Sequence, residues 1–363
     1  MGAYLSKEAN FAVVGCGEAG KAAGWFHGYQ LVAGGVEGAR LSDVVEPFLL
    51  SEEGRATPAG AAFQELVGRW AGTAVDFHRE VLEDELFANA YEALGGELGV
   101  FPSPKVALVA ASPVETPSLA EASLRVGATH LLLEPPGAAT AAGLRELAAV
   151  CEAKDAPLYV AFDLLRAEHV AGARAVDGDV VLVGRGGDGD DDAALAAAFA
   201  ARPEGLLVSG MTQELDACAR GWGLRRAAVK AVEVHAAGCD LRTLDGVTDF
   251  VAVDFTLVGA DGGRVRVAFD RRAAGPPPRA AVSDRATGAE LYAAAPRAAA
   301  GDEWAPPGLR ARAAAALRVK ADLAAAALRR GEPAGDVARA AAAADALDLA
   351  EYLLPVLRAA AGA

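Results

Sequence analysis

A glycine-rich turn between a predicted strand and a predicted helix constrains the fold of this chain more than any other feature. A short aromatic and β-branched run at 11–14 leads into the turn, and a helical pattern extends over 21–31. In a G-x-G-x-x-G turn the first glycine makes the tight bend, the second lets backbone approach a pyrophosphate, and the third lets the helix pack on the strand. We therefore predict that amides at the start of the helix bind a dinucleotide. The predicted residues are Gly15, Gly17, Glu18, Ala19 and Gly20.

A carboxylate at the end of the next predicted strand indicates which dinucleotide is bound. The strand at 41–45 ends in Glu46. Such a carboxylate accepts hydrogen bonds from both hydroxyls of the adenosine ribose and repels a 2′-phosphate, so NAD is favoured over NADP, although Arg55 nearby favours the reverse. The sequence of the turn is also close to the pattern of a nucleoside triphosphate-binding loop. However, Ala22 occupies the position where that loop needs a serine or threonine to bind magnesium.

The order of the predicted elements divides the chain into two domains. Apolar strands at 106–111, 129–133 and 158–162 alternate with helices, which is typical of a doubly wound parallel sheet. Beyond Arg166 the strands at 231–235, 250–257 and 264–269 pair as antiparallel strands do, the last two across a turn at 259–263. We predict an α/β protein with a Rossmann domain at 1–165 and an α/β domain at 166–363 whose open sheet is mostly antiparallel.

Composition and charge exclude several classes of partner. The net charge of −15 repels phosphate backbones and anionic lipids, and no apolar run approaches a membrane span, so we expect neither nucleic acid nor membrane as a partner. Four scattered cysteines without a CxxC pair suit a reducing compartment, and the start lacks a signal-peptide core, so we predict a cytoplasmic protein. Gly2 and Ser6 fit a myristoylation pattern, but a frayed terminus is the preferred interpretation.

No metal site is predicted. The five histidines share no ligand spacing. The acidic run at 188–192 does not fit a calcium loop and is interpreted as a solvated loop.

Six segments, taken in order, resemble the Gfo/Idh/MocA oxidoreductases, which include glucose-fructose oxidoreductase and inositol dehydrogenase. They are FAVVGCGEAG, VALVAASPVETP, GATHLLLEPPGAAT, LYVAFDLLR, GLLVSGMTQELD and DGVTDFVAVDFTL. The resemblance implies that Ser112 and Pro113 lie beside the cofactor and that Glu134 lies near the nicotinamide ribose. It also implies a homodimer formed through the sheet of the second domain.

The chain differs from that family at the positions that carry the catalytic residues. Family members that oxidise sugars or inositol carry Glu-Lys-Pro after the fifth strand, and here Pro135 replaces the lysine. Their Asp-x-x-x-His pair is replaced by Ser209 and Gln213. Serine and glutamine can bind a hydroxyl but cannot take up a proton near neutral pH, so these three positions are predicted to line a substrate pocket without supplying acid–base catalysis.

Two functions remain open from the sequence. The first is an NAD-dependent oxidoreductase that transfers a hydride to or from a polyol, sugar or related carbonyl compound, with its catalytic residues unassigned. The second is a non-catalytic NAD(H)- or sugar-binding sensor on the same fold. Few residues could supply catalysis from a different position in the sequence. Among the histidines His169 is the main candidate, whereas Asp163 and Asp216 are better explained by structural roles.

Overall fold

The computed structural model describes residues 8–33, 35–70, 75–80, 104–272, 274–296, 313–329, 331, 333 and 338–362. Gly2 and Ser6, which carry the acylation pattern, lie outside these ranges. The chain forms two compact units. The first comprises Met1–Ala138, Arg145–Ala161 and Ala300–Ala340, and the second comprises Ala139–Leu144, Phe162–Ala299 and Ala341–Ala363.

The first unit is built on a sheet of the predicted doubly wound type. Its strand order is β14-β6-β5-β4-β1-β2-β3. All neighbouring strands from β6 to β3 run parallel, and only the edge pair of β14 and β6 is antiparallel. The order reverses direction at β1, whose neighbours are β2 and β4, and sheets of this type bind ligands at the carboxyl ends of the strands beside such a reversal. The strands are β1 (Ala9–Val14), β2 (Ala39–Val45), β3 (Asp76–His78), β4 (Lys105–Val109), β5 (His130–Leu133), β6 (Leu158–Val160) and β14 (Ala338–Arg339).

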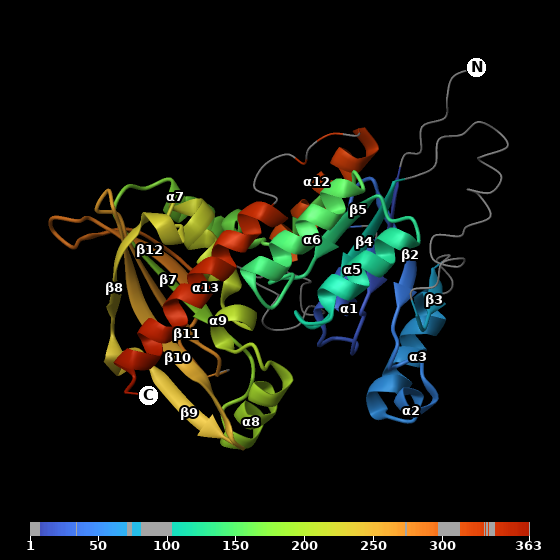
Figure 1. Ribbon diagram of the computed structural model, residues 1–363, viewed down its shortest axis with the longest axis horizontal. Coiled ribbons are helices and arrows are strands. Elements are labelled where there is room, and N and C mark those ends of the chain that lie inside the picture. The colour runs from blue at the N-terminus through green and yellow to red at the C-terminus, as the bar shows by residue number, and fades with distance from the viewer. Residues whose placement is uncertain are drawn as a thin grey trace. The chain divides into compact units, whose positions relative to one another are not determined.

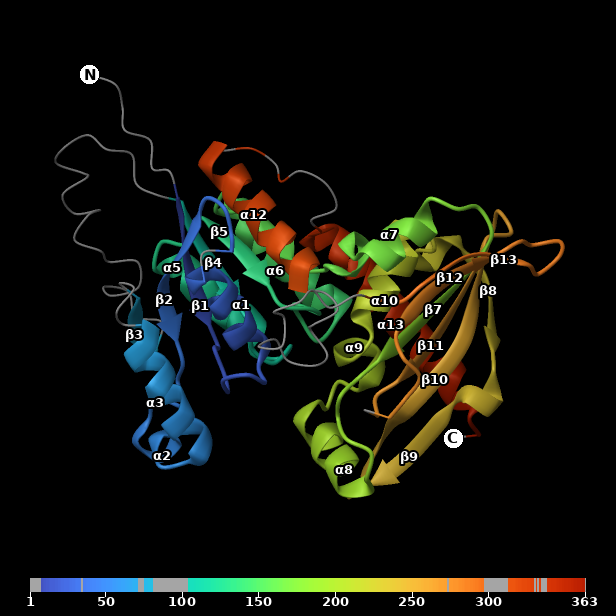
Figure 2. The same ribbon diagram turned by 180° about the vertical axis from the view of Figure 1, so that it is seen from behind.

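Helices cover both faces of this sheet, which explains why its strands are almost continuously apolar. Figure 1 shows α5 and α6 on one face, and Figure 2 shows α1 and α12 on the other. The six residues of β1 are all buried. The helices of this unit are α1 (Ala23–Val32), α2 (Glu52–Arg55), α3 (Pro58–Trp70), α5 (Thr116–Arg125), α6 (Ala141–Ala153) and α12 (Ala313–Arg329).

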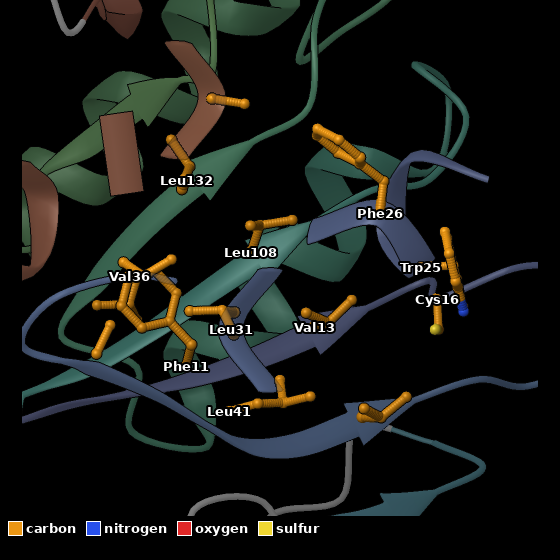
Figure 3. Close-up of a cluster of buried hydrophobic side chains, with 14 of the residues drawn as sticks. Phe11, Val13, Cys16, Trp25, Phe26, Leu31, Val36, Leu41, Leu108 and Leu132 are labelled. Atoms are coloured by element: carbon orange, nitrogen blue, oxygen red, sulfur yellow. The ribbon is translucent and has the colours of Figure 1, made fainter. Parts of the chain in front are cut away.

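The main core of the first unit lies between the sheet and the face covered by α1 and α12. Phe11 and Val13 of β1 meet Phe26 and Leu31 of α1 there (Figure 3). From α12, Val319 and Leu323 join the same cluster. A helix from late in the chain thus completes the core around the glycine turn.

The second unit is built on a mostly antiparallel sheet, as the sequence predicts. Its strand order is β13-β12-β7-β11-β10-β8, with β9 also paired to β10. Only β7 and β11 are parallel neighbours. The predicted hairpin is confirmed, because β10 and β11 pair across the turn that the Gly259 amide closes by donating to the Gly263 carbonyl. The strands are β7 (Asp179–Arg185), β8 (Val229–Val234), β9 (Asp240–Leu244), β10 (Val247–Gly259), β11 (Arg264–Asp270), β12 (Arg279–Ser283) and β13 (Glu290–Ala294).

One face of the second sheet is buried and the other is rich in charge. Val265, Val267 and Phe269 of β11 face the core, whereas Arg264 and Arg266 alternate with them on the opposite face. Figure 1 shows α13 lying across the sheet. The helices are α7 (Glu168–Arg174), α8 (Asp192–Ala201), α9 (Leu206–Ser209), α10 (Thr212–Asp216) and α13 (Ala340–Ala360), the last of which contains Pro355.

Candidate functional site

The first two glycines of the turn occupy positions where any side chain would be strained. Gly15 has a φ of +84°, and a Cβ there would lie 2.5 Å from the carbonyl oxygen of Ala110. Gly17 has a φ of +70°, and a Cβ there would lie 2.5 Å from the Cβ of Ala22. Both backbones therefore bend sharply between the end of β1 and the start of α1, as a phosphate-binding turn requires.

The third glycine of the pattern has a different role from the one predicted. Gly20 has a φ of +77°, but a Cβ there would meet nothing within 4 Å. At Gly24 a Cβ would lie 2.0 Å from the carbonyl oxygen of Gly15 and 2.9 Å from the Cα of Cys16. Gly24 is therefore the residue that lets the helix pack on the strand, which corrects the role given to Gly20.

The turn is consequently longer than the six-residue pattern suggests. Helix α1 begins at Ala23, and the amides of Lys21 and Ala22 both donate to the carbonyl of Glu18. The side chains of Lys21 and Glu18 form an ion pair of 2.6 Å. The extra residues form a small closed loop in front of the helix.

The Glu46 carboxylate lies against the glycine turn. Its Oε2 accepts a hydrogen bond of 2.6 Å from the Gly17 amide, and its Oε1 accepts from the amides of Phe48 and Leu49 at 3.3 Å each. The residue is buried. These bonds fix the carboxylate at the end of β2, where it can still accept further donors because each carboxylate oxygen has two lone pairs.

Cys16, inside the turn, is an unreactive thiol. The residue is fully buried in the core, and burial, with a smaller contribution from the negative charge of Glu46, raises its pKa far above that of a free thiol. Because the thiolate is the reactive form, this cysteine serves packing and not redox chemistry.

The segment after β4 turns directly into α5. The amides of Glu115 and Thr116 donate to the Ser112 carbonyl, and the Ser112 hydroxyl donates to the Glu115 carboxylate at 2.6 Å. Val114, two residues beyond Ser112, is 65% exposed. Phe48, which follows Glu46 after β2, is 51% exposed. Two large apolar side chains are thus presented to solvent from loops at the carboxyl edge, a feature that the sequence analysis missed.

Glu134 follows the carboxyl end of β5 and contacts a buried histidine, which in turn contacts a buried lysine. Its Oε2 lies 2.6 Å from His27 Nε2, and Lys320 Nζ lies 2.7 Å from His27 Nδ1. The Glu134 amide donates to the Val109 carbonyl, which holds the residue against β4. Pro135 comes next and is half-buried.

The structure thus brings the predicted cofactor residues of the first unit to the same edge of one sheet. The glycine turn follows β1, Glu46 follows β2, Ser112 and Pro113 follow β4, and Glu134 follows β5. Parallel strands place their carboxyl ends together, which is why residues so far apart in sequence converge.

The two predicted pocket residues of the second unit are engaged with backbone groups. Gln213 Oε1 accepts hydrogen bonds of 3.2 Å from the amides of Asp163 and Leu164. The Ser209 hydroxyl donates to the carbonyl of Gly205, the residue just before α9, at 2.8 Å. These bonds account for the polar groups without a substrate, and the role predicted for both residues stays a prediction.

The contacts and burial of His169 and Asp216, the other catalytic candidates, indicate structural roles. Burial lowers the pKa of His169 to about 4, so the side chain is neutral near pH 7. Asp216 is fully buried and forms two hydrogen bonds, of 2.5 and 2.6 Å, with Arg220 one helical turn later. Burial also lowers the pKa of His130 in β5.

Neither a membrane-spanning helix nor a cluster of metal ligands occurs in the described residues. No helix in these ranges is long and apolar enough to cross a membrane. No group of three or more histidine, cysteine or acidic side chains that could hold a metal ion occurs in them.

Comparison with known proteins identifies the fold through solved structures. Neither a protein-family model nor a curated protein sequence matches the chain. A myo-inositol dehydrogenase from Corynebacterium glutamicum is 16% identical with a TM-score of 0.63, and the match covers 96% of each chain. GenD2 from gentamicin A biosynthesis, in complex with NAD, is 18% identical with a TM-score of 0.63 and coverage of 97% of this chain and 95% of that one.

A third solved structure has a similar fold. An oxidoreductase from Agrobacterium radiobacter, in complex with NAD⁺, L-tartaric acid and magnesium, is 15% identical with a TM-score of 0.61 and coverage of 95% of this chain and 94% of that one. At these identities the likeness shows the fold. The chain therefore has the two-domain fold of the Gfo/Idh/MocA-type dehydrogenases, which confirms at the level of fold the resemblance seen in its sequence.

Proposed function

We propose that this protein binds NAD(H) at the carboxyl edge of its parallel sheet and is an oxidoreductase of the Gfo/Idh/MocA type. The observation that carries the proposal is the bond between the Gly17 amide and the Glu46 carboxylate. It joins a tight turn, in which an added Cβ at Gly15 or Gly17 would collide with Ala110 or Ala22, to a fixed acceptor for ribose hydroxyls. The residues present therefore fit a dinucleotide.

Each part of the cofactor would have its own residues. The amides around Gly17 and the start of α1 would hold the pyrophosphate, and Glu46 would accept hydrogen bonds from the adenosine ribose. The exposed side chains of Phe48 and Val114 would flank the adenine, because apolar surface at this edge suits a flat ring. Ser112, Pro113 and Glu134 would lie beside the nicotinamide half. When bound, the nicotinamide ring accepts or donates a hydride.

The substrate we propose is a polyol, a sugar or a related carbonyl compound. The support is the shared fold with dehydrogenases that act on inositol and on a nucleotide sugar. Pro135, Ser209 and Gln213 would line its pocket, where the lysine, aspartate and histidine of sugar-oxidising relatives are replaced. Loss of one positioned acid or base typically costs about 10²- to 10⁴-fold in rate, so turnover by these residues alone would be slow.

The alternative function is that of an NAD(H)- or sugar-binding sensor without turnover. The hydrogen bonds of Gln213 Oε1 and the Ser209 hydroxyl to backbone groups favour it, since these polar groups are already used to hold the local structure together. Function resides in the site and not in the fold, so activity has to be measured.

We also propose that the protein forms a homodimer through the charged face of its second sheet. Arg266 pairs with Asp254 at 2.6 Å on that face, and Arg264 pairs with Glu233 beside it. Neighbouring strands thus carry paired charges on a regular surface. Light scattering would show a dimer, and a monomer at micromolar concentration would contradict the proposal.

Titration of the purified protein with NADH tests the proposed binding. Gly17→Val is expected to abolish measurable binding, because the side chain would collide with Ala22 at a φ of +70°. Gly68→Ala is the matched control, since Gly68 lies in α3 with nothing within 4 Å of an added Cβ. Equal affinity of the two variants would contradict the proposed pyrophosphate position. Assays of hydride transfer across polyols, sugars and keto sugars then separate the enzyme from the sensor.

A further inference from the structure

A buried lysine on α12 faces the elements that form the cofactor edge. Lys320 is 1% exposed, and its Nζ lies 2.7 Å from His27 Nδ1 and 5.7 Å from the centre of the Phe26 ring. Removing an ammonium group from water is costly unless charge and hydrogen bonds compensate for it. A lysine at a fully buried position of an alanine-rich helix therefore indicates a specific role.

The hydrogen bonds fix the tautomer of His27. An ammonium group donates hydrogen bonds and accepts none, and lysine is a stronger base than histidine, so Nδ1 of a neutral His27 accepts from Lys320. The ring hydrogen then resides on Nε2 and is donated to Glu134 Oε2 at 2.6 Å. A line of donors therefore runs from Lys320 through His27 to the Glu134 carboxylate, and the charges at its two ends are opposite.

The accessible end of this line lies at the predicted cofactor site. The side chain of Glu134 is 20% exposed and that of His27 is 4% exposed, so solvent reaches the carboxylate and hardly reaches the imidazole. Glu134 follows β5 in one half of the doubly wound sheet, as Glu46 follows β2 in the other half. Each half of such a sheet holds one nucleotide of the cofactor, so the two carboxylates occupy corresponding positions.

We propose that Lys320 and His27 are positioning residues that hold Glu134 as an ionised, oriented acceptor for the hydroxyl or amide donors of the nicotinamide half of the cofactor. The inference rests on the proposed NAD(H) site. Where sugar-oxidising relatives have a lysine directly after this glutamate, this chain has Pro135, and Lys320 supplies a cation from the buried side instead. Its charge acts on the edge through His27.

Binding measurements on the unaltered protein and four variants test the positioning role. Lys320→Met removes the charge and keeps the length of the side chain, Glu134→Gln replaces the charged acceptor with a neutral amide, and Lys154→Met is the control because Lys154 is exposed in the same unit. A hydrogen bond to a charged group is worth about 1.5–3 kcal/mol, so Lys320→Met and Glu134→Gln are each expected to weaken NADH binding by about 10- to 150-fold. The double variant should bind NADH no more weakly than Glu134→Gln alone, since both changes act through the charge and orientation of the same carboxylate.

A spectroscopic measurement shows whether the line of donors exists. In ¹⁵N-histidine-labelled protein at pH 7, His27 is expected to carry its hydrogen on Nε2, and Lys320→Met should shift it toward a mixture of tautomers while Lys154→Met leaves it unchanged. Circular dichroism and thermal unfolding of every variant identify any that misfold.

The possible outcomes separate the two proposals. If the unaltered protein does not bind NADH, the proposed function fails and this inference fails with it. If it binds NADH and Lys320→Met, though folded, matches the control in affinity, then Lys320 serves only to stabilise the unit and the inference alone is overturned. A His27 ring with its hydrogen on Nδ1 would also overturn it.

Discussion

The Glu46 carboxylate accepts a hydrogen bond of 2.6 Å from the amide of Gly17, 29 residues earlier in the chain. The contact joins the end of β2 to the glycine turn after β1 and leaves the second carboxylate oxygen bound to the amides of Phe48 and Leu49. One acidic side chain therefore fixes two loops of the proposed cofactor site. This arrangement makes Glu46 the residue whose replacement should report most directly on cofactor choice.

Glu46→Gln should weaken NADH binding and reduce the preference for NADH over NADPH. The neutral amide loses a charged acceptor, which is worth about 1.5–3 kcal/mol, so NADH affinity should fall by about 10-fold or more. NADPH affinity should fall less, because repulsion of the 2′-phosphate disappears at the same time. Calorimetric titration with both cofactors measures the two changes. Glu52→Gln, on the exposed side of α2, is the control, and a parallel loss for both cofactors would contradict the assignment of Glu46 to the ribose.

Gly24→Ala should destabilise the first unit, whereas Gly68→Ala should not. The added methyl group at position 24 would lie 2.0 Å from the Gly15 carbonyl oxygen, so strand and helix must separate, at a cost of about 1–3 kcal/mol or more. At position 68 the methyl group meets open space, and alanine favours a helix by about 1 kcal/mol over glycine. Urea denaturation followed by circular dichroism measures both. Equal midpoints would contradict the packing role assigned to Gly24.

The glycines of the turn show which parts of the site could be predicted from the sequence. Gly15 and Gly17 were identified correctly as positions that require glycine, because strand, turn and helix follow each other locally. Gly24 was missed because Gly20 completes a familiar spacing, and only the backbone distance to Gly15 reveals which glycine supports the helix.

Long-range contacts could not be predicted from the sequence for a related reason. Lys320 lies 293 residues from His27, in an alanine-rich helix whose pattern predicts only amphipathic packing. A lysine at a buried position of that helix is a signal, but its partner depends on how α12 returns to the first unit. Asp188 is a similar case: it was interpreted as part of a solvated loop, yet its carboxylate pairs with Arg202 and Arg271.

Stability of the second unit should fall between neutral and mildly acidic pH because of His169. Its pKa is lowered to about 4 by burial, while in the unfolded chain it returns to about 6.5. Between these values the unfolded state binds a proton that the folded state does not, so stability is fully present above pH 6.5 and is lost as the pH falls toward 4. The loss amounts to about 3 kcal/mol at most. Urea midpoints at pH 7 and pH 5 should differ less in His169→Gln than in the unaltered protein, and an unchanged difference would contradict this account.

Arg271→Met should be the most damaging single substitution among the ion pairs of the second unit. The guanidinium is fully buried, with Asp249 at 2.8 Å, Asp188 at 3.0 Å and the Phe199 ring centre at 4.9 Å. Removing one partner of a buried ion pair leaves uncompensated charge and typically costs about 3–5 kcal/mol. Arg285→Met is the matched control, because Arg285 and Asp177 form an exposed pair of 3.1 Å and such pairs contribute about 0–1 kcal/mol. Thermal and urea unfolding compare the two variants. If Arg271→Met unfolds at the same midpoint as the control, then Arg202, which also binds Asp188, compensates for the lost charge, and the cluster does not depend on Arg271.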